Sequence, residues 1–256
     1  MRKGKSLLPL ALPVALSMAS PLMAACSQGT SGHAAVSRPA SRLSESTTFT
    51  TIKGTPADQG PAGDDGGLVV HPAAPVPVLD RPGGKAFATL PTSQLGGATW
   101  VPVVAESGDW ARVLLPSRPN AASGWISTQG GGLQRAHTSY LVKVELGKRT
   151  LTLLNAGRPL GHWRVAVGGP KTPTPTGRTF VLAMLQQSGG RLVLPLGTHS
   201  ATLDSFGGGP GTVALHGWPD RSVFGKAVTH GCVRVPAGAL KQLARVPLGS
   251  LVLITG

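Results

Sequence analysis

Glycine and proline recur so often along this chain that few stretches longer than ten residues lack both. The 36 Gly and 23 Pro residues disfavour long helices, because Pro removes a helical hydrogen bond and Gly has a low helix propensity. Apolar residues make up 41% of the chain and gather in short runs between turn-forming residues, which is typical of β-strands. The sequence therefore predicts a mainly β fold and excludes both a helical bundle and a wholly disordered chain.

Residues 1–25 have the pattern of a secretory signal peptide. A basic start precedes an apolar run that is too short for a comfortable transmembrane helix, and small residues follow that run. The segment ends as Met-Ala-Ala-Cys, which resembles the lipobox of bacterial lipoproteins, where the Cys is acylated. We therefore expect lipidation at Cys26 and a location on the outer face of the cytoplasmic membrane. Ordinary signal cleavage near Ala25 is the alternative.

Two segments of different composition follow the signal. Residues 26–66 are rich in Ser, Thr, Gly, Ala and Pro and nearly free of large apolar side chains, which predicts a flexible linker. Residues 67–130 hold six short apolar runs separated by turn signals, the pattern of a small antiparallel barrel. The runs around Trp110 and Trp125 resemble a bacterial Src-homology-3-like (SH3-like) domain. Domains of that kind bind cell-wall peptides or pack beside a catalytic domain.

After a short flexible joint predicted at 129–136, residues 137–256 have the size of one domain. Their apolar runs indicate strands, with KRT at 148–150 and NAGRP at 155–159 as hairpin turns. One good helix begins near Pro236, which suits a first helical turn. We expect a β-sandwich or barrel with this single short helix. The helix would place four apolar residues on one face: Ala237, Leu240, Leu243 and Ala244.

A lone thiol in an exported protein is a liability unless it is paired or used. With Cys26 acylated, Cys232 has no intramolecular partner, and its neighbours favour chemistry. A His takes the proton of a thiol near neutral pH, and glycines beside the nucleophile free backbone N–H groups to hold an oxyanion. An Arg holds a positive charge near a thiolate or binds a substrate carboxylate. The residues that indicate cysteine acyl transfer are His216, Gly217, His230, Gly231, Cys232 and Arg234.

The pattern HG…(T/S)HGC(V/I)R, which spans residues 216–234 here, resembles the signature of the L,D-transpeptidase catalytic domain family. Residues 137–256 as a whole are similar to that family. The similarity includes the TPTPTG stretch at 172–177, which we expect to be a rigid lead into a strand. The family's usual Ser is replaced by Thr229, which keeps the hydroxyl group.

The resemblance implies a role for each residue of the motif. Cys232 is expected to be the nucleophile, and His216 the general base and acid. The backbone carbonyl of Gly217 is expected to orient His216 through the second ring nitrogen. The residues expected on the oxyanion side or in support of the site are Gly217, His230, Gly231 and Arg234.

The same resemblance implies the reaction and its partners. The substrate would be a peptidoglycan stem tetrapeptide ending in D-Ala, a thioester would form on Cys232, and a 3→3 cross-link to a second stem would result. No metal or organic cofactor is expected, and carbapenem-type β-lactams are expected to acylate the same Cys. Two alternatives stay open. One is an L,D-carboxypeptidase that uses water as acceptor, and the other is a cell-wall-binding lipoprotein whose catalytic domain is idle.

The charge of the chain narrows the class of partner. The chain carries a formal charge of +14, and residues 137–256 hold 13 Lys and Arg against three acidic residues. A basic domain outside the cell meets anionic polymers such as wall carboxylates, teichoic acids and lipid headgroups. Nucleic acid is not expected as a partner, because there is no recognition motif and export removes the target. A zinc site on Cys232 and its His neighbours is not expected either, because a fourth ligand at a recognisable spacing is missing.

Overall fold

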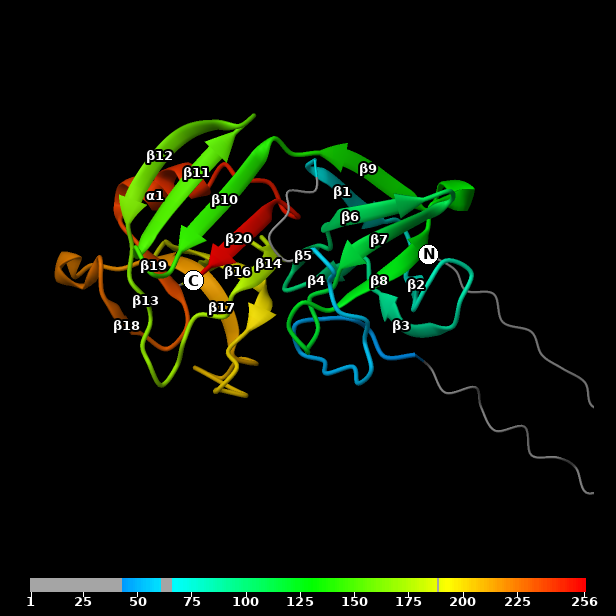
Figure 1. Cartoon of the computed structure of the whole chain (residues 1–256), viewed down its shortest axis with the longest axis horizontal. Coiled ribbons are helices and arrows are strands. Elements are labelled where there is room, and N and C mark those ends of the chain that lie inside the picture. The colour runs from blue at the N-terminus through cyan, green and yellow to red at the C-terminus, as the bar shows by residue number, and fades with distance from the viewer. Residues whose placement is uncertain (1–42, 61–65, 188) are drawn as a thin grey trace, which may run out of the picture. The chain divides into compact units, whose positions relative to one another are not determined.

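Strands dominate the computed structural model, which describes residues 43–60, 66–187 and 189–256 (Figure 1). Within these ranges there is one α-helix, α1 (Ala237–Leu243), in the place that the sequence predicts. Two short 3-10 helices lie at Gln129–Gly131 and Arg221–Val223. The mainly β fold expected from the spacing of Gly and Pro is confirmed.

The first half of the described chain forms a seven-stranded sheet in the order β3-β2-β8-β7-β6-β1-β9. The paired strands in this sheet are antiparallel. Along β7, buried Ala111 and Val113 alternate with half-buried residues, so one face of the sheet packs into a core. The strands are β1 (Leu68–Pro72), β2 (Val76–Leu79), β3 (Ala86–Leu90), β6 (Val101–Ser107), β7 (Trp110–Leu114), β8 (Ser123–Ser127) and β9 (Leu133–His137), beside a two-stranded pair of β4 (Ser93–Gln94) and β5 (Gly97–Ala98).

The second half forms a five-stranded sheet, β12-β11-β10-β20-β14, a four-stranded sheet, β15-β16-β17-β19, and a β13-β18 pair. The predicted hairpin turns are confirmed, because they join β10 to β11 and β11 to β12. The strands of the larger sheet are β10 (Tyr140–Glu145), β11 (Thr150–Asn155), β12 (Arg158–Arg164), β14 (Gly177–Phe180) and β20 (Leu251–Thr255). The others are β13 (Val167–Gly168), β15 (Leu185–Gln187), β16 (Arg191–His199), β17 (Thr212–Gly217), β18 (Ala227–Thr229) and β19 (Val233–Val235).

Strand β20 belongs to two hydrophobic cores at once. Leu251 and Leu253 pack with the apolar side chains of the seven-stranded sheet, whereas Val252 and Ile254 pack with β10, β11, β17 and α1. Successive side chains of a strand point to opposite faces, so a continuous apolar run such as that of β20 is buried on both sides. The two predicted domains therefore share a core, and residues 42–256 form one compact unit.

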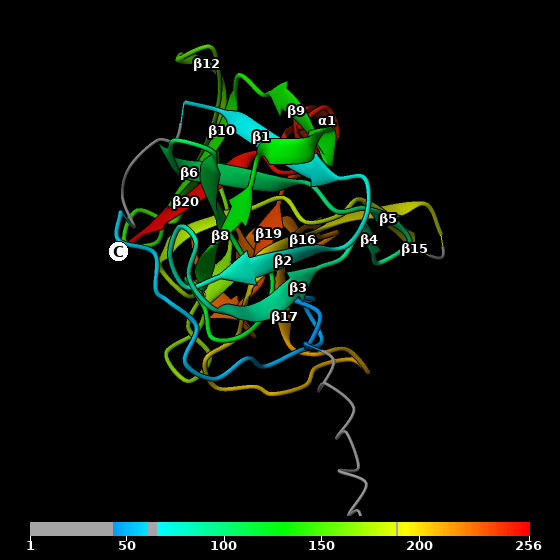
Figure 2. The ribbon, with the colours of Figure 1, turned by 90° about the vertical axis from the view of Figure 1, so that its right-hand side faces the viewer.

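The prediction of a flexible joint at 129–136 is wrong. Residues 133–137 form β9, which pairs with β1 in antiparallel register from Leu68 opposite His137 to Pro72 opposite Leu133 (Figure 2). The three glycines before β9 make the turn, and β9 then covers the otherwise open edge of β1. The segment is therefore part of the first sheet.

The prediction of a flexible linker over 26–66 is wrong for residues 43–60. This segment makes a bridge from Glu45 to β3 and bridges from Thr51 and Ala57 to the loop between β7 and β8, and the side chain of Ile52 enters the core. Apart from Ile52, the segment is ordered by hydrogen bonds and one ion pair. Its polar composition therefore gave no indication of this structure. The rest of the predicted linker lies outside the described residues.

The ion pair joins Asp58 to Arg178 of β14. Their side chains are only 1% and 6% exposed, and Arg178 Nε donates to Asp58 Oδ2 at 2.8 Å. Burial alone would raise the pKa of the Asp58 carboxyl, but the hydrogen bond and the charge of Arg178 outweigh it and hold the pKa below its ordinary value. The pair therefore fastens the segment before the first sheet to the second half of the chain.

The predicted signal peptide at 1–25 and the predicted lipidation site Cys26 lie outside the described residues. Within the described ranges, no helix combines the length and the apolar character that a bilayer span requires. The expected membrane location therefore stays a prediction from the sequence.

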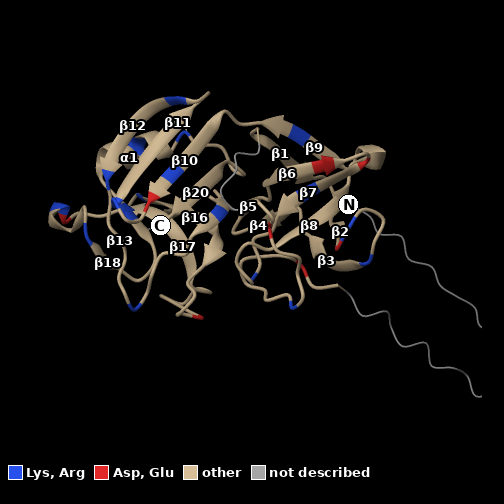
Figure 3. Ribbon diagram, in the orientation of Figure 1, with Lys and Arg blue, Asp and Glu red and all other residues tan. Residues whose placement is uncertain are grey.

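Basic side chains are spread over the second half of the chain. Figure 3 shows Lys and Arg on several of the elements from β10 to α1, with acidic residues at few places. Many of these side chains are exposed, among them Lys143, Arg158, Arg164, Lys241 and Arg245. The positive charge from which we predicted anionic partners therefore faces solvent.

Candidate active site

Two parallel strands carry the residues expected to do the chemistry. β17 ends in His216-Gly217, and Cys232 immediately precedes β19. The register sets His216 opposite Arg234 on the neighbouring strand. Val233 and Val235 point into the core, so the alternate positions Cys232 and Arg234 project from the other face. The strand pairing therefore brings together residues that lie 16 positions apart in the sequence.

His216 is held by its own neighbour. Its Nδ1 lies 2.9 Å from the carbonyl oxygen of Gly217, which is the contact that the resemblance implied. A carbonyl only accepts, so we assign the Nδ1–H as donor, which leaves Nε2 free to accept a proton. Burial lowers the pKa of His216; the charges of Arg234 and Arg191 lower it further, and the Gly217 hydrogen bond partly opposes them. The imidazole is therefore neutral near pH 7.

Cys232 is a free, half-buried cysteine. Burial raises the pKa of its thiol, and a hydrogen bond from the backbone of Ala214 and the charge of Arg234 oppose this rise without cancelling it. The thiol therefore keeps its proton at neutral pH. Since the thiolate is the nucleophilic form, chemistry at Cys232 requires a base to remove that proton.

The turn before Cys232 is built around the hydroxyl of Thr229. This hydroxyl donates to the Cys232 carbonyl at 2.6 Å and accepts from the Gly231 N–H at 3.1 Å. Gly231 has a φ of 115°, a conformation that side-chain-bearing residues rarely adopt. Thr229 therefore supplies the hydroxyl that Ser would supply at this position.

Two further threonines hold the same turn, and the sequence reasoning missed both. Thr172 Oγ1 donates to the Thr229 carbonyl at 2.8 Å, and Thr174 Oγ1 donates to the Gly231 carbonyl at 2.8 Å. Thr174 also accepts from the Gly168 N–H at 2.9 Å, which ties it to β13. The signal was present in TPTPTG, where prolines fix the backbone between regularly spaced hydroxyls. The stretch is thus more than a lead into β14.

Arg234 is stacked on an aromatic ring. Its guanidinium carbon lies 3.6 Å from the centre of the Trp218 ring, and that ring meets His216 edge-on at 6.0 Å between centroids. The buried Nε of Arg234 has no hydrogen-bond partner among the described residues. Trp218 was not among the predicted site residues, although an aromatic residue directly after His-Gly was a signal. The stack fixes a positive charge beside His216.

His230 lies at the exposed rim of the Cys232 turn. Its ring contacts that of Phe206, with 5.0 Å between centroids. The loop that carries Phe206 is held by side chains that follow β7. Arg118 donates to the carbonyl of Pro210 at 2.7 Å, and Asn120 donates to that of His199 at 2.7 Å. The rim of the site therefore depends on the first half of the chain.

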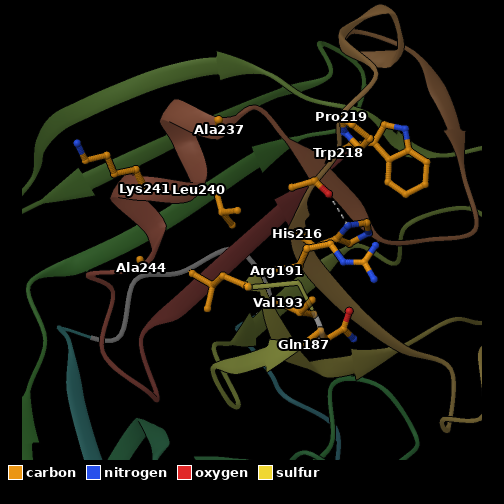
Figure 4. A pocket seen from close by; sticks show the side chains of 13 residues that line it. Gln187, Arg191, Val193, His216, Trp218, Pro219, Ala237, Leu240, Lys241 and Ala244 are labelled. Atoms are coloured by element: carbon orange, nitrogen blue, oxygen red, sulfur yellow. Dashed lines mark hydrogen bonds between the residues drawn. The ribbon is translucent and has the colours of Figure 1, made fainter.

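The described residues contain no cluster of three or more His, Cys, Asp or Glu side chains that could hold a metal ion. They do contain a groove of about 750 Å³ that begins at His216 and runs along α1 (Figure 4). Cys232 is not among the residues that line it. His216 therefore lines this groove and lies on the strand that pairs with β19, which begins directly after Cys232.

Comparison with known proteins agrees with this geometry. A family model described as the L,D-transpeptidase catalytic domain matches residues 139–254. The YkuD protein of Bacillus subtilis (strain 168), which bears the name of an L,D-transpeptidase, is 32% identical over 146 residues, 55% of this chain and 84% of the relative. Its namesake in Bacillus licheniformis is 30% identical over 165 residues, 62% of this chain and 94% of the relative.

A solved structure of an L,D-transpeptidase from Mycobacterium smegmatis matches 57% of this chain and 91% of its own, at 15% identity and a TM-score of 0.39. The matches to the two YkuD proteins cover most of their length, and the family-model match includes both His216 and Cys232. The family that the motif suggested is thereby confirmed. This chain belongs to the L,D-transpeptidase catalytic domain family.

Proposed function

We propose that this chain forms 3→3 cross-links between peptidoglycan stem peptides through a thioester on Cys232. One observation carries the proposal. A neutral His216, held at Nδ1 by Gly217, lies one strand away from the half-buried thiol of Cys232 in a parallel pair. This is a base with its second nitrogen free, next to a nucleophile that needs one.

In the first half-reaction, Nε2 of His216 takes the proton of the Cys232 thiol. The thiolate attacks the carbonyl carbon of the third stem residue, a C–S bond forms, and the carbonyl electron pair moves onto oxygen. The Gly231 N–H already donates to Thr229, so we assign the oxyanion first to the Cys232 N–H. Protonated His216 then donates to the leaving amine of D-Ala, the C–N bond breaks, and a thioester remains.

In the second half-reaction, a side-chain amine of another stem loses a proton to His216 and attacks the thioester. The C–S bond breaks, and the departing thiolate of Cys232 is protonated again by His216. Arg234 keeps a fixed positive charge beside both groups, and its stack on Trp218 holds that charge in place. With water in place of the amine, the same residues would make an L,D-carboxypeptidase.

Product analysis tests the proposal. The full chain is incubated with a disaccharide tetrapeptide, and the products are identified by mass spectrometry. Cross-linked dimer with release of one D-Ala is the expected result. A tripeptide without dimer would establish the carboxypeptidase instead, and unchanged tetrapeptide would favour the wall-binding lipoprotein.

The acid limb of the pH–rate profile is predicted to depend on Arg234. His216 must be neutral to act as base, so its lowered pKa moves the loss of activity to a lower pH than an ordinary His would give. Replacing Arg234 by Gln removes a charge that lowers the pKa of His216, so the acid limb should move to higher pH. The pH–rate profile of acylation by a carbapenem measures this shift. The exposed Arg245→Gln is the control, and an acid limb that stays in place in Arg234→Gln contradicts the prediction.

Thr174→Val is predicted to slow acylation of Cys232 by about 10- to 100-fold, because a small displacement of a nucleophile costs that much. Val has the shape of Thr but cannot donate to the Gly231 carbonyl. Thr174→Ser should restore most of the rate. The measurement separates the rate of acylation at saturating carbapenem from carbapenem binding, with melting temperature as a check on folding.

The matched control is Thr152→Val on β11, where the hydroxyl contacts His162 on the surface. Equal rates for Thr174→Val and Thr152→Val would show that Thr174 does not position the turn. A loss in Thr174→Val that Thr174→Ser does not recover would point to side-chain volume instead of the hydroxyl.

A further inference from the structure

The groove beside His216 has walls from three elements. α1 contributes Leu240 and Lys241, the start of β16 contributes Arg191, and the chain after β17 contributes Trp218. Figure 4 shows these side chains around the groove, with His216 at one end and Lys241 toward the other. The volume of about 750 Å³ is within the range of small-molecule and peptide sites.

Three of the four apolar residues predicted to share one face of α1 line this groove. Ala237, Leu240 and Ala244 border it at helical spacing, whereas the helix is anchored in the core by Ala239 and Leu243. Ala237 and Ala244 are both exposed. The helix thus packs into the core through Ala239 and Leu243, while half-buried Leu240 both contacts the core and lines the groove.

Two positive charges accompany this apolar surface, and no acidic residue lines the groove. Arg191 and Lys241 are both exposed, and neither belongs to an ion pair among the described residues. Arg191 is near enough to His216 to lower the pKa of the imidazole. The groove is therefore complementary to a partly apolar ligand that carries a carboxylate.

The second half-reaction indicates which ligand this groove would bind. The acceptor amine has to reach His216 while the donor stem is bound to Cys232 as a thioester. The groove contacts His216 and does not include Cys232, so a peptide that lies in it reaches the base without occupying the Cys232 turn.

We propose that this groove is the acceptor site, and that Lys241 and Arg191, at different places along it, recognise free carboxylates of the acceptor stem peptide. This inference rests on the proposed function and adds to it the route and the charge requirement of the second substrate. Lys241 and Arg191 are specificity-determining residues here, and Leu240 supplies an apolar contact to the peptide.

The test measures partition of the thioester between dimer and hydrolysed tripeptide in the full chain. The acceptor is a stem peptide offered with its carboxylates either free or amidated, and D-Ala release without acceptor is the internal reference. Lys241→Gln should lower the ratio of dimer to tripeptide about tenfold with the free-carboxylate acceptor at subsaturating concentration. Lys241→Gln should also remove the preference that the wild type has for the free-carboxylate acceptor over the amidated acceptor.

Lys85→Gln, an exposed lysine of the first sheet, is the matched control and should keep both ratios. Lys241→Glu should lower the dimer ratio further than Lys241→Gln, because it places a negative charge against the carboxylate. An unchanged ratio and preference in both Lys241 variants overturns the acceptor site while the proposed function stands. A wild type that neither releases D-Ala nor binds a carbapenem covalently overturns the proposed function itself.

Discussion

Replacing Cys232 by Ala is expected to abolish covalent reaction with a carbapenem, a loss of at least about 10³-fold. In the proposed mechanism the covalent intermediate is a thioester on this sulfur. The sequence contains only one other cysteine, Cys26. Intact-mass spectrometry should therefore show a single adduct on the wild type and none on Cys232→Ala.

His216→Ala should slow the same reaction by about 10²- to 10⁴-fold, the usual contribution of a general base. The effect should be large because burial raises the pKa of the Cys232 thiol, which leaves little thiolate without help. Cys26→Ala is the control and should keep the adduct. An adduct on Cys232→Ala, with the fold intact by circular dichroism, would contradict the assignment of the nucleophile.

Replacing Asp58 by Asn is expected to lower the free energy of unfolding by about 3–5 kcal/mol, the usual cost of removing one partner of a buried ion pair. Both side chains are almost fully buried, so water cannot replace the carboxylate beside Arg178. The loss should be seen in urea unfolding. Limited proteolysis should also begin to cut within residues 43–60, because the variant lacks the ion pair that joins this segment to β14.

The effect of Asp58→Asn should depend on pH with a definite sign. The folded pKa of Asp58 lies below the ordinary value of 3.8, so its stabilisation is complete above that value and is lost as the pH falls through the folded pKa. The difference between wild type and variant should therefore be constant at neutral pH and shrink in strong acid. Glu106→Gln, in an exposed pair with Arg135, is the control and should change stability by less than about 1 kcal/mol. An equal effect of the two variants would contradict the prediction.

The features that the sequence predicted correctly are those that depend on residues close together in the chain. Gly and Pro spacing indicated the strands, and a stretch of 19 residues around Cys232 and His216 indicated the family. The parallel pairing of β17 with β19 then brings the two ends of that stretch onto adjacent strands.

What the sequence did not reveal depends on partners far away in the chain. Asp58 is ordered by Arg178, which lies 120 positions later in the chain. No pattern in the segment that contains Asp58 indicates that pair. Thr174 acts on the Gly231 carbonyl across 57 positions. Periodicity found an apolar face on α1 but could not tell a face that enters the core from one that lines a groove.

The order of residues 43–60 bears on the geometry of the membrane attachment that the sequence predicts. If the proposed anchor is Cys26, a linker that ran to residue 66 would let the folded part stand as far as about 150 Å from the lipid, at the full extension of a polypeptide. The described residues begin at Leu43, about 17 residues after Cys26, and the contour length of that interval is at most about 60 Å whatever its conformation. With an anchor at Cys26, this short interval would limit the reach of the folded part to the layer of cell wall nearest the membrane.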